Sequence, residues 1–86
     1  MSKFEKLKQK ILSGEFDRNI EFDELRKLIL SLNFQERIRG SHHIYYKDEV
    51  KEIINIQPNQ QKAKPYQVKQ VRELIIKYKL ISFNNE

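Results

Sequence analysis

Two adjacent histidines, His42 and His43, are the side chains in this sequence best suited to acid–base chemistry. Histidine is the only side chain whose unperturbed pKa allows it both to take up and to release protons near neutral pH. The 86 residues include no cysteine, so thiol nucleophiles, disulfides and cysteine-ligated zinc sites are excluded. The candidate chemistry is therefore proton transfer by a histidine, provided that the surrounding elements expose it to a substrate.

The two histidines stand at the start of a stretch with the residue pattern of a β-strand, and in a strand adjacent side chains point to opposite faces. His42 and His43 therefore cannot share one site, which also disfavours a metal site made by the pair. Ile44 and Tyr46 share the face of His42, whereas Tyr45 shares that of His43. Periodicity alone leaves open which face packs against the core. It also leaves open a purely structural role for both histidines, which is the commoner role of a strand histidine.

Hydrophobic periodicity divides the chain into helices and strands. Apolar residues recur at helical spacing over 3–13 and 22–32, and each of these segments is followed by a residue that favours a left-handed cap. Alternating or β-branched residues then predict three strands, over 34–39, 43–46 and 50–56. The polar segment that follows is expected to be a loop, and a last helix begins at Pro65, because proline is tolerated in the first turn.

This order of elements predicts an α+β fold. Without the first helix it is α-β-β-β-α, the arrangement of double-stranded-RNA-binding domains, in which two helices cover one face of a three-stranded antiparallel sheet. The predicted fold is therefore double-stranded-RNA-binding-domain-like, with an extra N-terminal helix over 3–13. Residues 1–86 are expected to form a single domain, since this length provides one modest core. The other face of the sheet stays bare and is a candidate binding surface.

The charge distribution favours an anionic partner. The net charge is +5, and residues 60–86 contribute most of it, with 6 Lys/Arg against 2 Asp/Glu, whereas residues 1–59 carry 11 against 10. A basic segment of this kind is compatible with RNA, DNA or an acidic protein, and equally with a solvated charged surface. No apolar run approaches the roughly 20 residues of a membrane span, and the first residues form no apolar signal segment. We therefore expect a cytoplasmic protein that does not associate with a membrane.

A longer pattern around the histidines resembles the HicA (YcfA-like) toxin family. The resemblance is carried by a helix that ends in a Leu-Asn-Phe turn (residues 22–34), by a basic strand over 37–39 and by Gly-Ser-His at 40–42. The segments 54–58 and 62–72 match a lysine-rich branch of that family. The similarity thus extends from residue 22 to about residue 80.

The resemblance implies an endoribonuclease toxin of a type II toxin–antitoxin system, which binds and cleaves mRNA and is held inactive by a HicB-like antitoxin. It maps the family's Gly-Ser-His motif onto Gly40, Ser41 and His42, with His42 as the catalytic histidine. It also implies that His42 lies on the outward face of the sheet, and that His43 and Tyr45 lie on the helix side.

Three features depart from the family pattern. Asn33 stands where the glycine before the turn phenylalanine is usual. Many members carry a second histidine just after the proline that follows the third strand, and here Asn59 and Gln60 follow Pro58. The first helix, over 3–13, lies outside the part that resembles the family.

Cleavage of RNA needs no metal or cofactor, because a base that deprotonates the 2′-hydroxyl lets this oxygen attack the adjacent phosphate. Arg39 and Lys47, which are close in sequence to the histidines, are predicted to neutralise the phosphate charge. Lys62 and Lys64 precede a helix N-terminus, where backbone N–H groups and the dipole favour phosphate. Tyr46 is predicted to lie near the catalytic histidine and to stack on a base. Lysines on the exposed face of the last helix are expected to form solvated ion pairs instead.

Two other interpretations fit the same residues. A double-stranded-RNA-binding-like module that binds RNA without cleaving it would have no need of the second histidine. A pure interaction protein would use the basic surface only for an acidic partner. RNA cleavage that depends on His42 distinguishes the toxin from both.

Overall fold

The computed structural model describes residues 3–81 and has the predicted α-β-β-β-α order behind an additional N-terminal helix. A three-residue 3-10 turn, η1, lies within the segment that links the first two helices. The elements are α1 (Lys3–Ser13), η1 (Asp17–Asn19), α2 (Phe22–Ser31), β1 (Gln35–Arg39), β2 (His42–Lys47), β3 (Val50–Ile56) and α3 (Pro65–Tyr78).

The three strands form one antiparallel sheet with β2 in the centre. Strand β2 is one residue longer at each end than its sequence pattern predicts, because Arg39 and His42 pair directly across the tight turn at Gly40 and Ser41. Gly40 adopts a φ of +57° at the first central position of this turn, where glycine is favoured. A Cβ atom at Gly40 would meet no other atom within 4 Å, so the backbone conformation, and not lack of space, requires glycine here.

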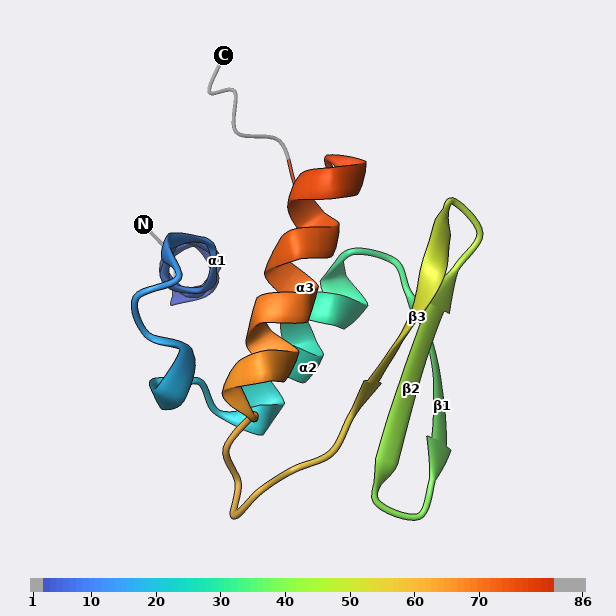
Figure 1. The fold of residues 1–86 in the computed structure, drawn as a ribbon, viewed down its shortest axis with the longest axis horizontal. Coiled ribbons are helices and arrows are strands. Elements are labelled where there is room, and N and C mark those ends of the chain that lie inside the picture. The colour runs from blue at the N-terminus through green and yellow to red at the C-terminus, as the bar shows by residue number, and fades with distance from the viewer. Residues whose placement is uncertain (1–2, 82–86) are drawn as a thin grey trace.

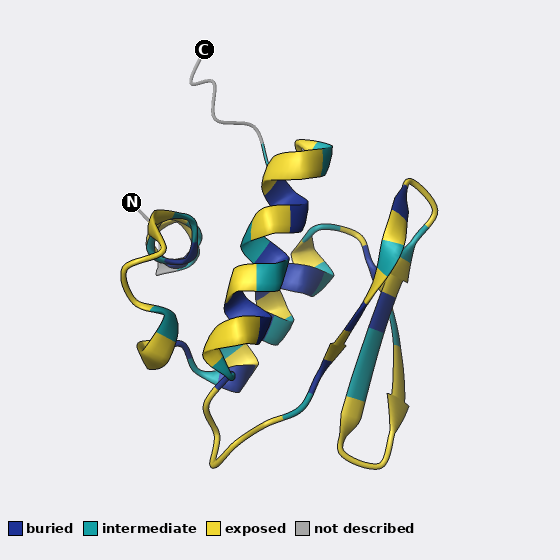
Figure 2. Cartoon of the chain, viewed as in Figure 1, coloured by how far each residue is buried: buried dark blue, intermediate teal, exposed yellow. Residues whose placement is uncertain are grey.

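Helices α2 and α3 cover one face of the sheet, and the core lies between the two layers (Figure 1). Figure 2 shows that the buried residues of the helices face the sheet, while exposed residues cover the opposite side of each helix. The apolar spacing of three and four residues along each helix produces this division. The fully or nearly fully buried residues that meet here include Leu25, Leu28, Ile29, Tyr45, Ile54, Ile56, Val68, Val71 and Ile75. No helix within residues 3–81 is both long and apolar enough to span a bilayer.

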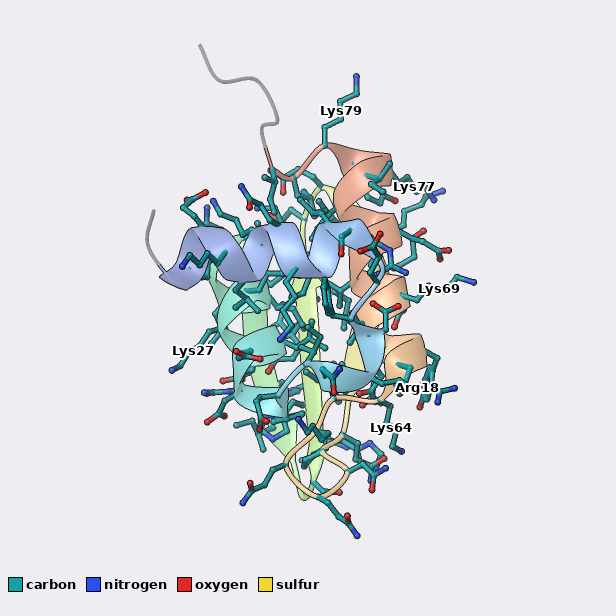
Figure 3. All side chains as sticks on the ribbon, turned by 90° about the vertical axis from the view of Figure 1, so that its left-hand side faces the viewer. Arg18, Lys27, Lys64, Lys69, Lys77 and Lys79 are labelled. Carbon is teal, nitrogen blue, oxygen red and sulfur yellow. The ribbon has the colours of Figure 1, made fainter. Side chains whose placement is uncertain are left out.

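Helix α1 lies on the side of the helix pair away from the sheet, as Figures 1 and 3 show from two directions. Leu7 and Ile11, one turn apart, are buried and belong to the same core cluster as the other helices. Arg72 of α3 fixes the end of α1, because its guanidinium donates to both carboxylate oxygens of Asp17 at 2.9 and 3.1 Å and to the Ile11 carbonyl at 3.1 Å. The additional helix is therefore part of the packed structure.

The segment between β3 and α3 is the predicted loop, and backbone hydrogen bonds hold it against the start of α2. The Phe22 N–H donates to the Gln61 carbonyl and the Ala63 N–H to the Ile20 carbonyl, both at 2.9 Å. Within α3, the buried Gln67 accepts a hydrogen bond from the Lys64 N–H at 3.2 Å. These contacts give the first turn of α3 a defined position beside the end of the sheet.

Candidate active site

The two histidines lie on opposite faces of the sheet. His42 is exposed on the outer face, directly across from Arg39 of β1. His43 lies on the helix side, where its ring packs edge-on against Phe22 with the centroids 4.8 Å apart. The outward orientation that the family resemblance implies for His42 is therefore the one observed, and Tyr45 is fully buried on the other face.

His42 is oriented by the neighbouring strand β3. Its Nδ1 lies 3.3 Å from Oδ1 of Asn55, the residue opposite Ile44 in the sheet. A carbonyl oxygen can only accept a hydrogen bond, so this contact selects the imidazole tautomer that carries its proton on Nδ1. The lone pair on Nε2 is then available to take a proton from a substrate.

A small hollow of about 240 Å³ adjoins His42. It is lined by His42, Asn55, Gln57, Tyr66 and Gln67. Gln57 connects the hollow to the turn, because its amide nitrogen donates to the Ser41 hydroxyl at 3.0 Å. Of these residues, only His42 was predicted from the sequence to belong to the site. Strand parity could have placed Asn55 and Gln57 on the outer face, but no local pattern brings Tyr66 of α3 next to β2.

A second and larger hollow, of about 590 Å³, lies on the arginine-bearing part of the outer face. It is lined by Arg37, Arg39, Ile44, Tyr46 and Ile53. Tyr46 was predicted to lie near His42, but Ile44 stands between them on the same face. Residues four apart in a strand are about 13 Å apart. Tyr46 therefore accompanies the arginines, while Tyr66 takes the place beside the histidine.

The predicted lysines do not gather around His42. Lys47 ends β2, about 17 Å along the strand from His42, and its ammonium lies 3.4 Å from a carboxylate oxygen of Glu49. Lys62 pairs with Glu21 at 3.0 Å. Lys64 projects into solvent just before α3 (Figure 3). Closeness in sequence was misleading for Lys47 because an extended strand carries each residue away from its neighbours.

The inner face holds a closed polar network around Glu36. Both carboxylate oxygens accept from the Arg26 guanidinium, at 2.7 and 3.0 Å, and one also accepts from the Tyr45 hydroxyl at 2.7 Å. The hydrogen bond from Arg26 lowers the pKa of Glu36 to about 2, although burial opposes this shift. Burial in turn raises the pKa of Tyr45 above its usual value. Nδ1 of His43 lies 3.7 Å from Glu36, beyond hydrogen-bond distance.

The position of the second family histidine falls in the loop between β3 and α3, and neither Asn59 nor Gln60 lines the hollow beside His42. Asn59 exchanges two backbone hydrogen bonds with Lys62, at 2.9 and 3.0 Å. Gln60 lines a different hollow, together with Pro58 of the same loop and with Glu21, which precedes α2. Within residues 3–81, no three or more His, Cys, Asp or Glu side chains are grouped in a way that could hold a metal ion.

A family model described as "HicA toxin of bacterial toxin-antitoxin" matches residues 22–77, which is more than half of the chain. The chain belongs to the HicA toxin family. The match runs from the first residue of α2 into the last turn of α3, and so includes the whole sheet and His42 but not α1. No curated protein and no solved structure matches the chain. Membership identifies it as the toxin of a toxin–antitoxin system, which implies an antitoxin partner.

Proposed function

We propose that this HicA toxin is an endoribonuclease that binds and cleaves mRNA by metal-independent acid–base catalysis at His42. The observation that carries the proposal is the setting of this residue on the open face of the sheet. His42 is exposed, Asn55 holds its Nδ1 from one neighbouring strand, and Arg39 faces it from the other. A proton acceptor beside a cation is the pair of groups that RNA cleavage requires.

In the proposed reaction, Nε2 of His42 takes the proton of a ribose 2′-hydroxyl. The 2′-oxygen attacks the adjacent phosphorus, and the bond from phosphorus to the 5′-oxygen breaks. The products are a 2′,3′-cyclic phosphate and a 5′-hydroxyl, whose proton returns from the imidazolium directly or through water. Asn55 holds the ring in both charge states, and Arg39 neutralises the charge that develops on the phosphate. One positioned histidine contributes about 10²–10⁴ in rate.

RNA would lie along the outer face with its backbone near the basic residues. Gly40 and Ser41 form the turn beside His42, and the Ser41 hydroxyl is held by Gln57. Arg39 is the cation directly at the site. Lys64, just before α3, is the stronger candidate of the two predicted loop lysines for a more distant phosphate, because Glu21 already neutralises Lys62. Tyr46 and Lys47 would contact RNA further along β2.

We further propose that the antitoxin is HicB-like and covers this same face. Tyr46 and Ile53 expose 38% and 60% of their surface there, beside Arg37 and Arg39. Apolar side chains rimmed by charges are typical of protein interfaces. An acidic partner would complement the net charge of +5. A stable interface buries about 1,200 Å² or more, so an antitoxin of this kind would exclude RNA by occupancy.

The purified chain is tested by incubation with mRNA in the presence of a chelator. We expect cleavage to persist and the new ends to carry 2′,3′-cyclic phosphate and 5′-hydroxyl groups. A His42→Ala preparation, purified in parallel, is expected to leave the RNA intact. Products with 5′-phosphate ends, or cleavage that requires added metal, would contradict the proposed mechanism.

The alternative function is a module that binds RNA without cleaving it. The specific observation in its favour is that amides, Asn59 and Gln60, stand where many family members have a second histidine. This alternative expects the same RNA affinity in the His42→Ala variant and in the unmodified chain, with no new ends from either protein.

A further inference from the structure

We propose that the hollow beside His42 is a nucleobase subsite, in which the Tyr66 ring stacks on an unpaired base of single-stranded RNA next to the scissile phosphate. The inference rests on the proposed nuclease function and specifies its substrate class. A base is free to stack on a side chain only where the RNA is not in a duplex.

The exposure of Tyr66 is the first argument. Tyr66 is 65% exposed, the highest value among the large apolar side chains exposed within residues 3–81. It precedes the buried stripe of α3, which begins with Gln67 and Val68, so packing does not explain its ring. The hydrogen bond from the Lys64 N–H to Gln67 fixes the first helical turn from which Tyr66 projects. A rigidly mounted aromatic ring open to solvent is the usual platform for a base.

The hydrogen-bonding capacity of the lining is the second argument. Asn55 uses its amide oxygen on His42, so its NH₂ group can donate to a ligand. Gln57 uses its amide nitrogen on Ser41, so its oxygen can accept from a ligand. A donor beside an acceptor matches the edge of a nucleobase, whereas a phosphate offers only acceptors. The lining contains no lysine or arginine, which also favours a neutral ligand.

The position of His42 between the two hollows is the third argument. On the side of β1 lie Arg39 and the arginine-lined hollow. On the other side lie Asn55 and the hollow that contains Tyr66. A ribose at His42 would therefore direct its phosphate toward the arginine and its base toward the tyrosine. The arginine-lined hollow would then contact the RNA backbone, and the tyrosine-lined hollow would contact a base.

The test measures binding of single-stranded oligonucleotides made of 2′-fluoro RNA, which lack the attacking hydroxyl and so stay intact. Each is compared with a series in which one position at a time is abasic. We expect Tyr66→Ala to weaken binding by roughly tenfold, with an unchanged dependence on salt because no charge is removed. Tyr66→Phe should bind as the unmodified chain does. Removing the base that stacks on Tyr66 should weaken binding to the unmodified chain. The same abasic oligonucleotide should lose much less affinity for the Tyr66→Ala variant.

Ile76→Ala is the matched control, since Ile76 is an apolar residue of α3 with 57% exposure that lies outside the hollow. The proposal is overturned if Tyr66→Ala binds RNA as Ile76→Ala does, or if it weakens binding equally to the abasic and the intact oligonucleotides. Loss of antitoxin binding with unchanged RNA binding would also overturn it and make Tyr66 a protein contact. Failure of the nuclease proposal is distinguishable, because natural RNA would then stay uncleaved while the effect of Tyr66 on binding persisted.

Discussion

His42 and His43 are neighbours in sequence but occupy opposite environments. His42 is exposed on the outer face, with one hydrogen bond to Asn55, and lies between an arginine-lined and a tyrosine-lined hollow. His43 is covered by α2, packs against the Phe22 ring and approaches the carboxylate of Glu36. The same side chain is thus available for proton transfer on one face and is part of the folded structure on the other.

The inner face also differs in holding a polar network around Glu36. Glu36 accepts three hydrogen bonds from Arg26 and Tyr45 within the space between α2 and the sheet. The outer face offers groups with spare capacity, such as the amides of Asn55 and Gln57. A buried polar group without a partner destabilises the fold, whereas an exposed one is hydrated and remains able to bind a ligand. The Glu36 carboxylate is therefore satisfied within the fold, although the buried Nδ1 of His43 beside it has no hydrogen-bond partner, whereas the outer face presents exposed amides with unused hydrogen-bonding capacity.

The largest expected effect separates the two histidines. His42→Ala should lower the cleavage rate by about 10²–10⁴ and change the free energy of unfolding by less than about 0.5 kcal/mol. His43→Ala should instead cost about 1–2 kcal/mol of stability through lost packing and keep the cleavage rate at temperatures where it stays folded. Rate assays and urea unfolding of both variants check this. A well-folded His43→Ala variant that no longer cleaves RNA would contradict the assignment of catalysis to the outer face and of a purely structural role to His43.

Glu36→Gln tests the network of the inner face. The substitution keeps the shape of the side chain but removes the negative charge to which Nε and Nη2 of Arg26 donate. We therefore expect the free energy of unfolding to fall by about 1–3 kcal/mol. Glu49→Gln is the control, because Glu49 is exposed beside Lys47 and its substitution should change stability less than Glu36→Gln does. Equal effects of the two variants would show that the network around Glu36 contributes no more to stability than an exposed ion pair.

Acid should remove the contribution of Glu36. Its pKa is about 2 in the folded chain and about 4.3 when unfolded, so the unfolded state binds the proton first. The stabilisation is therefore present above about pH 4.3 and is lost as the pH falls toward 2. We expect the stability difference between the unmodified chain and Glu36→Gln to shrink across this window. A difference that stays constant in unfolding experiments from pH 5 to pH 2 would contradict the ion pair.

Asn55→Asp tests the orientation of His42 on the outer face. Asn55→Asp keeps an oxygen that can accept from the Nδ1–H group and should retain cleavage. Asn55→Leu keeps the size of the side chain without an acceptor and should lower the rate. NMR of the ring nitrogens provides a readout of the tautomer that is independent of activity. An unchanged tautomer in Asn55→Leu would mean that Asn55 does not position the ring.

The smallest expected effect concerns the phosphate contacts made by the arginines of the outer face. Replacing Arg37 and Arg39 with Ala together should reduce the log–log salt dependence of RNA binding by up to about 1.4, at about 0.7 for each lost single-strand phosphate contact. Lys27 and Lys69 project from the helix layer (Figure 3), and their double Ala variant should leave the slope unchanged. Equal slopes for the two double variants would mean that RNA does not prefer the outer face.

Much of the fold could be predicted from local patterns. The spacing of apolar residues located the start of each α-helix and the bounds of each strand to within one or two residues but not the short turn η1, and the left-handed caps appear at Gly14 and Asn33 with φ of +76° and +70°. Alternation along β2 required His42 and His43 to face opposite ways. These features depend only on residues within a few positions of one another, which is why the sequence alone determined them.

Tertiary structure decided what lies beside His42. Periodicity left open which face of the sheet is covered, since that depends on where α2 and α3 pack. Tyr66 reaches the site across 24 positions of chain, whereas Lys47, only five positions away, lies at the far end of the strand. The end of helix α1 is held by Arg72 of α3, 61 positions away from Ile11, to which no sequence motif pointed. Contacts between distant segments follow from how the layers pack against one another, and local sequence does not encode that geometry.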